Sequence, residues 1–189
     1  GGAVGIRANG ASDIQAIRQR AALPIIGIQK WHAPDGLLWI TPTFQEAMAV
    51  ASAGAQIVAV DSRRVERPRR ETLGGLFDRI HSELRVPVMA DISSYEEARR
   101  AQDLGADLVA TTFAIEGRDA PDFDLLARLV ESLAVPVVAE GLFWELDQVC
   151  RALDVGVHAV VVGSAITRPD EITARFVKAI RLSYMGGDA

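Results

Sequence analysis

Cysteine and histidine are scarce in this sequence. Its 189 residues include one cysteine, Cys150, and three histidines without any ligand spacing. A single cysteine excludes an internal disulfide and a cysteine-rich zinc site, and scattered histidines argue against a metal centre. The chain also has no dinucleotide-binding fingerprint and no Walker loop. We therefore expect no metal, and we expect Cys150 to lie in the core of a helix.

An excess of basic residues and long apolar runs are also missing. Twenty Lys and Arg face 25 Asp and Glu, which gives a formal net charge of −5. Binding to nucleic acid or to an anionic membrane needs a basic surface, so neither partner is expected. The apolar stretches are too short to span a bilayer, and no signal peptide opens the chain. The composition, 49% apolar and 24% charged, predicts one cytoplasmic globular domain.

Short apolar runs of two kinds alternate along the chain. Some follow Gly and small residues, others carry Pro at their start, and all are rich in Val and Ile. This is the pattern of parallel strands buried on both faces. The Gly-type runs are 2–7, 54–61, 105–112 and 156–163, and the Pro-type runs are 23–28, 86–91 and 135–140.

Helical patterns separate these runs. Helices are expected to open at Ser12, at Thr43, at the capping box of Ser94 and Glu97, and at Pro169. Strand–helix units of roughly 20–30 residues predict a parallel sheet with helices outside it. Their regular recurrence favours a closed TIM (β/α)₈ barrel over a doubly wound open sheet.

The seven runs are one strand short of such a barrel. The chain begins and ends on a Gly-type run, so the absent member is a Pro-type strand before Gly2. We expect the first strand and helix to be missing from a barrel domain over 1–185, with a tail or linker stump at 186–189. An open barrel exposes edges and apolar core, which predicts either a longer natural chain or a homo-oligomer.

Polar residues follow nearly every run, at the end where such barrels carry their active sites. They are Arg7, Lys30, Asp61, Asp91, Thr112, Glu140 and Gly163–Ser164. A lysine in a partly dry site has a lowered pKa and can act as a base or Schiff-base nucleophile, so Lys30 is a candidate, although a surface lysine is also possible there. Glu140 is either a second acid–base group or a rim carboxylate. Asp91 fits the orientation of a neighbour or of a sugar hydroxyl.

The last unit has the features of a phosphate site. Gly163–Ser164 ends a run just before a helix, where glycine allows close approach and free N–H groups bind anions. Gly141 would supply the neighbouring loop and Arg168 a charged contact; a plain glycine turn with a solvated Arg168 is the alternative. Five arginines between Arg63 and Arg70 form either an anion-facing loop or a solvated loop, and we favour the solvated loop.

These residues resemble the bacterial N-acetylmannosamine-6-phosphate 2-epimerase family. The matching segments, in the family's order, are 1–10, 24–28 with Lys30, 40–43, 89–94, 139–141 and 161–169. The resemblance implies a TIM-barrel isomerase without metal or organic cofactor. It implies that N-acetylmannosamine 6-phosphate and N-acetylglucosamine 6-phosphate are interconverted in sialic acid and amino sugar breakdown. Some family members are fused to a sugar kinase.

The resemblance also implies roles. Lys30 and Glu140 would be the catalytic pair, whereas Arg7, Asp91 and Thr112 would bind the sugar. Gly141, Gly163, Ser164 and Arg168 would hold the phosphate. The C2 proton lies α to the aldehyde of the open-chain sugar, so its removal needs a base and a donor to the enolate oxygen. Lys30 is the expected base and Glu140 the group for ring opening or sugar oxygens; the donor of the second proton stays open.

Three segments depart from the family pattern. Trp31–His32 stand in place of Arg-Asp, Phe113–Gly117 in place of a Gly-Tyr-Thr loop, and Trp144–Leu146 in place of a Thr-Pro-Glu helix start. Two other functions therefore remain open: another TIM-barrel isomerase or lyase acting on a phosphorylated sugar, and a non-catalytic phosphosugar-binding domain.

Overall fold

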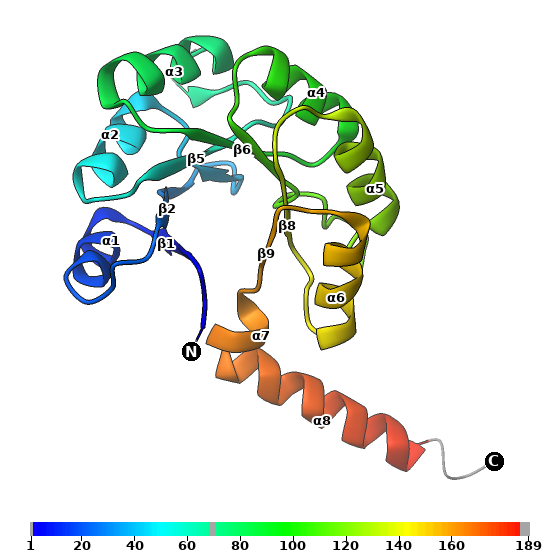
Figure 1. The fold of residues 1–189 in the computed structure, drawn as a ribbon. Coiled ribbons are helices and arrows are strands. Elements are labelled where there is room, and N and C mark those ends of the chain that lie inside the picture. The colour runs from blue at the N-terminus through cyan, green and yellow to red at the C-terminus, as the bar shows by residue number, and fades with distance from the viewer. Residues whose placement is uncertain (1, 69–70, 186–189) are drawn as a thin grey trace.

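A parallel sheet curls into a nearly closed barrel. The computed structural model describes residues 2–68 and 71–185. Its main sheet has seven strands in chain order, and Figure 1 shows helices around its outside. These strands are β1 (Ile6–Asn9), β2 (Ile25–Ile28), β5 (Ile57–Asp61), β6 (Val88–Asp91), β7 (Leu108–Ala110), β8 (Val137–Glu140) and β9 (Ala159–Val161). The predicted TIM-barrel architecture is confirmed, and within the described ranges β1 and β9 flank an opening without pairing.

The helices begin where the sequence signals place them. Thr43 and Glu46 form a capping box at the start of α2, Ser94 accepts the N–H of Glu97 at the start of α4, and Pro169 begins α8. The helices are α1 (Ala11–Arg18), α2 (Phe44–Ser52), α3 (Leu73–Arg79) continued by a π-helical turn (Ile80–Leu84), α4 (Tyr95–Asp103), α5 (Phe123–Ser132), α6 (Leu146–Val155), α7 (Ser164–Thr167) and α8 (Pro169–Met185). Cys150, expected in a helix core, is exposed on α6, because α6 turns that side to solvent.

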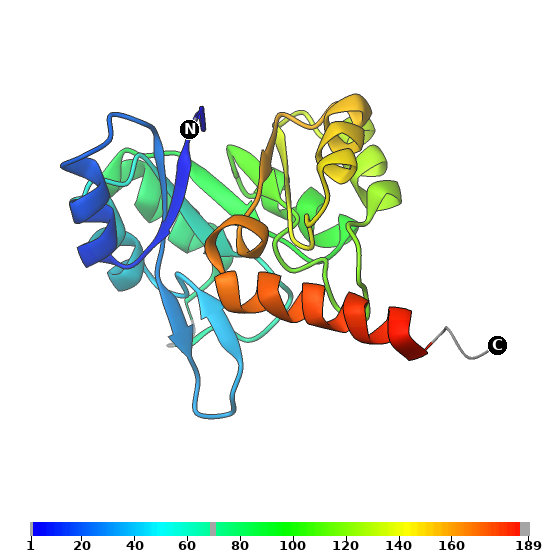
Figure 2. The ribbon, with the colours of Figure 1, turned by 90° about the horizontal axis from the view of Figure 1, so that it is seen from below.

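Two strand boundaries differ from the prediction. The run 2–7 becomes a strand at Ile6, where pairing with Ile25 of β2 starts, so Arg7 lies within β1. Lys30 does not end the Pro-type run at 23–28. It begins β3 (Lys30–His32), which forms an antiparallel hairpin with β4 (Leu38–Ile40). In Figure 2 this hairpin, in light blue, projects from one end of the barrel.

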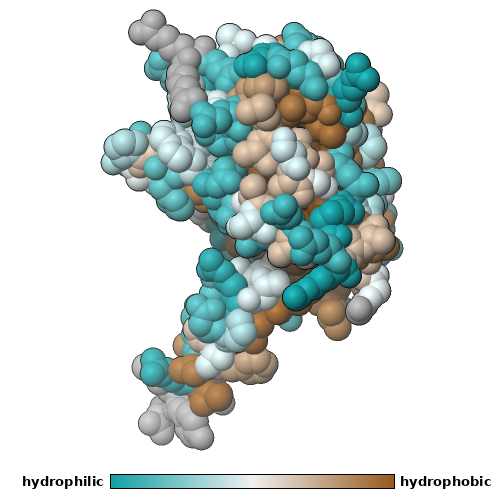
Figure 3. All heavy atoms as spheres, turned by 90° about the vertical axis from the view of Figure 1, so that its left-hand side faces the viewer, coloured by the Kyte–Doolittle hydropathy of each residue, from teal (hydrophilic) through white to brown (hydrophobic). Residues whose placement is uncertain are grey.

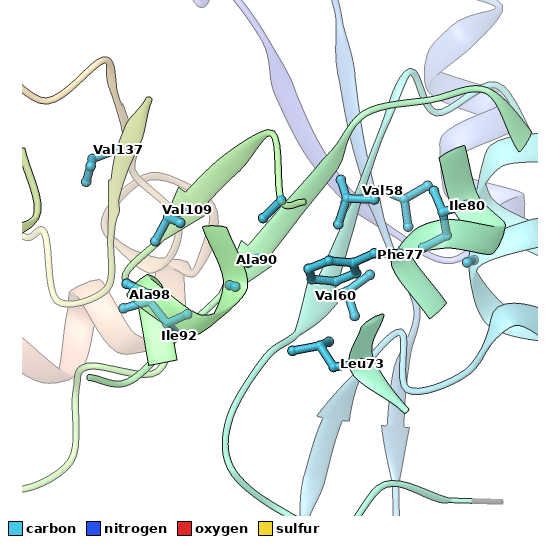
Figure 4. Packing of buried hydrophobic residues seen from close by; sticks show 14 of the residues in the cluster. Val58, Val60, Leu73, Phe77, Ile80, Ala90, Ile92, Ala98, Val109 and Val137 are labelled. Atoms are coloured by element: carbon cyan, nitrogen blue, oxygen red, sulfur yellow. The ribbon is translucent and has the colours of Figure 1, made fainter. Parts of the chain in front are cut away.

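The core has two layers. Inside the barrel lie Ile28, Ile40, Ala59, Met89, Ala110 and Val138. The second layer lies between the sheet and the helices, where Phe77 packs beside Val58 and Val60 (Figure 4). A Cβ on Gly27 would lie 2.5 Å from Cβ of Ala55 and 3.1 Å from Cβ of Val50, so glycine lets α2 and the turn after it approach the sheet. Residues that face the barrel interior and residues that face the helices alternate along the strands, which produces the two layers.

Helix α8 projects away from the barrel (Figure 1). Arg175 on α8 forms an ion pair with Glu145 at 2.7 Å and lies over the ring of Trp144. Four apolar side chains of α8 are exposed: Phe176, Val177, Ile180 and Leu182. Figure 3 shows hydrophobic surface on this projection. In the described ranges, no helix is long and apolar enough to cross a membrane.

Candidate active site

Strand alternation turns the predicted polar residues into the barrel. Met89 and Val138 belong to the interior layer, so Asp91 and Glu140, two residues further along β6 and β8, face the same way. Arg7 enters from β1, and its Nη1 lies 3.6 Å from the sulfur of Met89. Three predicted residues from three separate strands therefore meet above the interior layer.

Arg7 links the two carboxylates. Its Nη1 and Nη2 donate to Oδ1 and Oδ2 of Asp91 at 3.0 and 2.5 Å, a bidentate arrangement. Nη1 also lies 3.1 Å from Oε2 of Glu140. The hydroxyl of Thr112 donates to Oδ1 of Asp91 at 2.7 Å. Asp91 is fully buried and the side chain of Arg7 is 7% exposed, so these charges interact with little screening by water.

Burial changes the protonation of Glu140. Desolvation raises the pKa of Glu140 above its ordinary value, and the charge of Asp91 adds to this effect. Arg7, the Thr112 hydroxyl and Lys30 work in the opposite direction. Burial alone would lower the pKa of Arg7, but Asp91 and Glu140 outweigh it, so this pKa is raised. Arg7 is thus permanently charged, whereas the raised pKa of Glu140 makes its carboxyl a candidate for exchanging protons with a substrate.

One oxygen of Glu140 is left for a bound molecule. Among the buried side-chain atoms of the described residues, Oε2 of Glu140 and Nη2 of Arg67 have no hydrogen-bond partner. The contact between Oε2 and Arg7 is therefore an ion pair without hydrogen-bond alignment. A buried oxygen in this state is costly unless a donor reaches it. A hydroxyl of a bound sugar is a suitable donor.

Lys30 reaches the site from the hairpin. Its backbone N–H donates to Oδ1 of Asn9 at 2.8 Å, and it pairs with Ile40 across the hairpin. Directly opposed residues point to the same face, and Ile40 packs in the barrel interior. Lys30 is also close enough for its charge to lower the pKa of Glu140. The expectation of a partly dry lysine is wrong for this structure, because Lys30 is exposed.

The predicted phosphate residues lie on two neighbouring loops. Glu140 pairs with Val161, which places the loops that follow β8 and β9 side by side. Gly141 has φ 101°, and Gly163 is the residue before α7. Ser164 begins that helix, whose first N–H groups have no carbonyl partner within the helix. Arg168 is exposed and forms an ion pair with Glu171.

Several contacts at this end of the barrel were not predicted. The arginine-rich segment is not simply solvated: Arg67 is 8% exposed, and Arg63 is bound to Asp61, while Arg69 and Arg70 lie outside the described residues. Burial is the main reason that the pKa of Arg67 falls to about 10. Strand alternation, which predicts the inward direction of Asp91, predicts the same direction for Asp61, because Ala59 belongs to the interior layer. Its partner Arg63 lies in the following loop, and strand alternation does not predict this contact.

The acidic residues of the mouth are not arranged as a metal site. Within the part of the chain that the structure describes, no three His, Cys, Asp or Glu side chains are grouped so that they could hold a metal ion. Arg7 instead supplies the positive charge that the carboxylates of Asp91 and Glu140 face.

The barrel and its mouth define a TIM-barrel enzyme with acid–base groups at the carboxyl ends of its strands. Residues 1–182 match the family described as "Putative N-acetylmannosamine-6-phosphate epimerase". The chain belongs to this family.

Individual relatives agree with this assignment. Two relatives carry the name "Putative N-acetylmannosamine-6-phosphate 2-epimerase". The protein from Caldanaerobacter subterraneus is 44% identical over 96% of this chain and 79% of the relative. The protein from Clostridioides difficile is 44% identical over 97% of this chain and 84% of the relative. The solved structure of the N-acetylmannosamine-6-phosphate 2-epimerase from Clostridium perfringens is 38% identical, with a TM-score of 0.90. It covers 94% of this chain and 80% of that one.

Proposed function

We propose that this chain interconverts N-acetylmannosamine 6-phosphate and N-acetylglucosamine 6-phosphate by proton transfer at C2. The observation that carries the proposal is the cluster at the mouth. Arg7 joins Asp91 and Glu140, and one oxygen of Glu140 lacks a hydrogen-bond partner. Lys30 faces the same barrel interior. The names of the relatives supply the substrate and the position of the reaction.

The C2 proton is acidic in the open-chain sugar because the aldehyde stabilises the resulting enolate. Lys30 takes this proton as the general base. Glu140 has a raised pKa and exchanges a proton with the sugar oxygens, which opens the ring. Asp91 and Thr112 bind hydroxyls, while Arg7 keeps both carboxylates in place. Inversion at C2 requires that a proton is then delivered to the opposite face of the enolate, and Lys30 and Glu140 are the two candidate donors.

The phosphate would bind at the loops after β8 and β9. Gly141, Gly163 and Ser164 offer backbone N–H groups, and the two loops follow paired strands. Arg168 would leave Glu171 for the phosphate, because an exposed ion pair of this kind is weak. The substrate would thus extend from its phosphate at the loops after β8 and β9 to its C2 atom near Lys30.

The proposal is tested by following N-acetylmannosamine 6-phosphate with the wild-type protein by proton NMR of the anomeric signals. Appearance of N-acetylglucosamine 6-phosphate is expected, with much slower conversion of N-acetylmannosamine, which lacks the phosphate. Conversion to any other product would replace the proposal with another phosphosugar isomerase or lyase. Broadened substrate lines without conversion would instead favour a phosphosugar-binding domain.

Three further proposals concern the setting of this domain. The opening between β1 and β9, with exposed apolar residues on α8, supports self-association, for which light scattering should give the mass of an oligomer.

Phosphorylated sugars are intracellular metabolites, which supports a cytoplasmic location. We also propose a barrel domain over 1–185, with a sugar kinase as a functional partner; residues 186–189, expected to be a tail or linker stump, lie outside the described residues.

A further inference from the structure

The strand that begins with Lys30, β3, buries none of its residues. All three residues of β3 are exposed, whereas Trp39 and Ile40 of β4 are buried. A two-stranded hairpin alone is marginally stable in water. The position of Lys30 therefore depends on the contacts that attach the hairpin to the barrel.

The first attachment is at the base of the hairpin. The N–H of Gln29 donates to Oγ1 of Thr41 at 3.1 Å, and the N–H of Thr41 donates to the carbonyl of Gln29 at 2.8 Å. Thr41 is fully buried with φ 47°, a left-handed conformation that is costly for a β-branched residue. The barrel thus holds the base of the hairpin firmly, but these bonds do not fix its outer half.

The second attachment is Arg63. Its Nη2 donates to the carbonyl of Leu38 at 2.7 Å, and Leu38 pairs with His32 in the outer half of the hairpin. Arg63 is held in turn by the buried Asp61, through Nε to Oδ1 at 3.0 Å and Nη2 to Oδ2 at 2.7 Å. One guanidinium therefore connects the end of β5 to the hairpin.

Aromatic contacts fix the plane of this guanidinium. The Cζ of Arg63 lies 3.8 Å from the ring centre of Phe113 and 6.0 Å from that of Trp39. Phe113 follows Thr112, which contacts Asp91 in the site. The side chain of Arg63 thus bridges three segments around the mouth.

We propose that Arg63 is a positioning residue for the C2 proton transfer: the base contacts fix the backbone of Lys30, and Arg63 holds the rest of the hairpin so that the side chain of Lys30, at the start of β3, stays directed at the barrel mouth. The inference rests on the proposed function. A lysine at this position could not make the paired bonds to Asp61, reach Leu38 and stack on Phe113 together, because an ammonium group is not a planar fork.

The test compares Arg63→Met, Arg63→Lys and the matched control Arg64→Met. Arg64 is the exposed neighbour, and its backbone N–H donates to Oε1 of Glu97, so the control should behave as wild type. For Arg63→Met we expect kcat to fall by about 10–100-fold, because a displacement of about 1 Å in a reacting group has effects of this size. KM should change much less, and Arg63→Lys should not restore kcat.

A pH profile distinguishes positioning from general destabilisation. Lys30 lowers the pKa of Glu140, so displacing Lys30 should move the acid limb of kcat/KM to higher pH in Arg63→Met. An unchanged kcat and an unchanged acid limb in this variant would overturn the inference.

Hydrogen exchange separates this inference from the proposed function. We expect faster exchange of the hairpin amides at 30–32 and 38–40 in Arg63→Met than in wild type or Arg64→Met. If the wild-type protein does not epimerise the sugar, the proposed function fails, while this measurement still decides whether Arg63 holds the hairpin. Equal exchange in all three proteins would overturn the inference.

Discussion

At the scale of single residues, the site depends on the charge of Arg7. Asp91 is buried completely, and its Oδ1 and Oδ2 both bind Arg7. Two buried carboxylates without a cation would repel each other and would lose the hydration that they have in the unfolded chain. Arg7 is therefore both a structural and a functional residue.

Replacing Arg7 should destabilise the fold. Arg7→Met leaves Asp91 without its cation, so we expect the free energy of unfolding to fall by about 3–5 kcal/mol, as measured by urea denaturation. Adding Asp91→Asn should recover part of this loss, because the remaining side chain is neutral. A loss below about 1 kcal/mol in Arg7→Met would contradict the geometry.

Replacing Glu140 should separate activity from stability. Because burial raises the pKa of Glu140, the protonated carboxyl stabilises the folded state below the unfolded pKa. This stabilisation is lost as pH rises through the folded pKa. The melting temperature of Glu140→Gln minus that of wild type should therefore increase with pH over this interval. Epimerisation should fall by about 10²–10⁴-fold. A difference in melting temperature that decreases with pH would refute the assigned direction.

Sequence reasoning found the buried charges but not all of their partners. Asp91 and Glu140 each stand two residues after an interior apolar residue, so strand alternation is sufficient to predict their direction. The contacts of Arg63 with Leu38 and Phe113 join loops far apart in the chain, and no local pattern encodes them.

At the scale of elements, all seven barrel strands were predictable and the hairpin was not. Strands covered on both faces are apolar at nearly every position, which makes them conspicuous. The hairpin is short and mostly exposed, so it lacks this signal. Its turn, Pro34–Asp35–Gly36 between two tryptophan-containing runs, is nevertheless typical of a hairpin.

The turn after β8 offers a test at this scale. Gly141 has φ 101°, and a Cβ there would lie 2.7 Å from Cγ2 of Ile115. Gly141→Ala should lower the free energy of unfolding by about 1–3 kcal/mol because of backbone strain and this clash. The KM for the phosphorylated sugar should also rise.

The double variant Gly141→Ala with Ile115→Ala separates the two causes. Removing Cγ2 of Ile115 relieves the clash but leaves the strained φ, so stability should return only partly. Full recovery would mean that the left-handed backbone at Gly141 has no cost.

At the scale of the whole molecule, stability should be uneven around the barrel. All four residues of β6 are buried, whereas all three of β9 are only half-buried beside the opening. At protein concentrations where the chain is a monomer, we expect the amides of β6 to exchange more slowly than those of β9 by about tenfold or more. Equal protection at higher concentrations would indicate that the opening is covered in solution, as the proposed self-association requires.

The seven strands of the described sheet could be predicted from the sequence, but the course of α8 could not. The alternating Gly-type and Pro-type runs correspond to these seven strands. The apolar residues of α8 show which positions can be buried, but they do not specify the surface against which they pack. The exposed positions at Phe176 and Ile180 therefore required the structure.

The most direct test of the account is deuterium incorporation at C2 from D₂O, followed by proton NMR for wild type and Lys30→Ala. Wild type should replace the C2 proton of N-acetylmannosamine 6-phosphate and form deuterated N-acetylglucosamine 6-phosphate. Lys30→Ala should slow this exchange by about 10²–10⁴-fold with an unchanged melting temperature, since Lys30 is exposed. Exchange at the wild-type rate in Lys30→Ala would contradict the account.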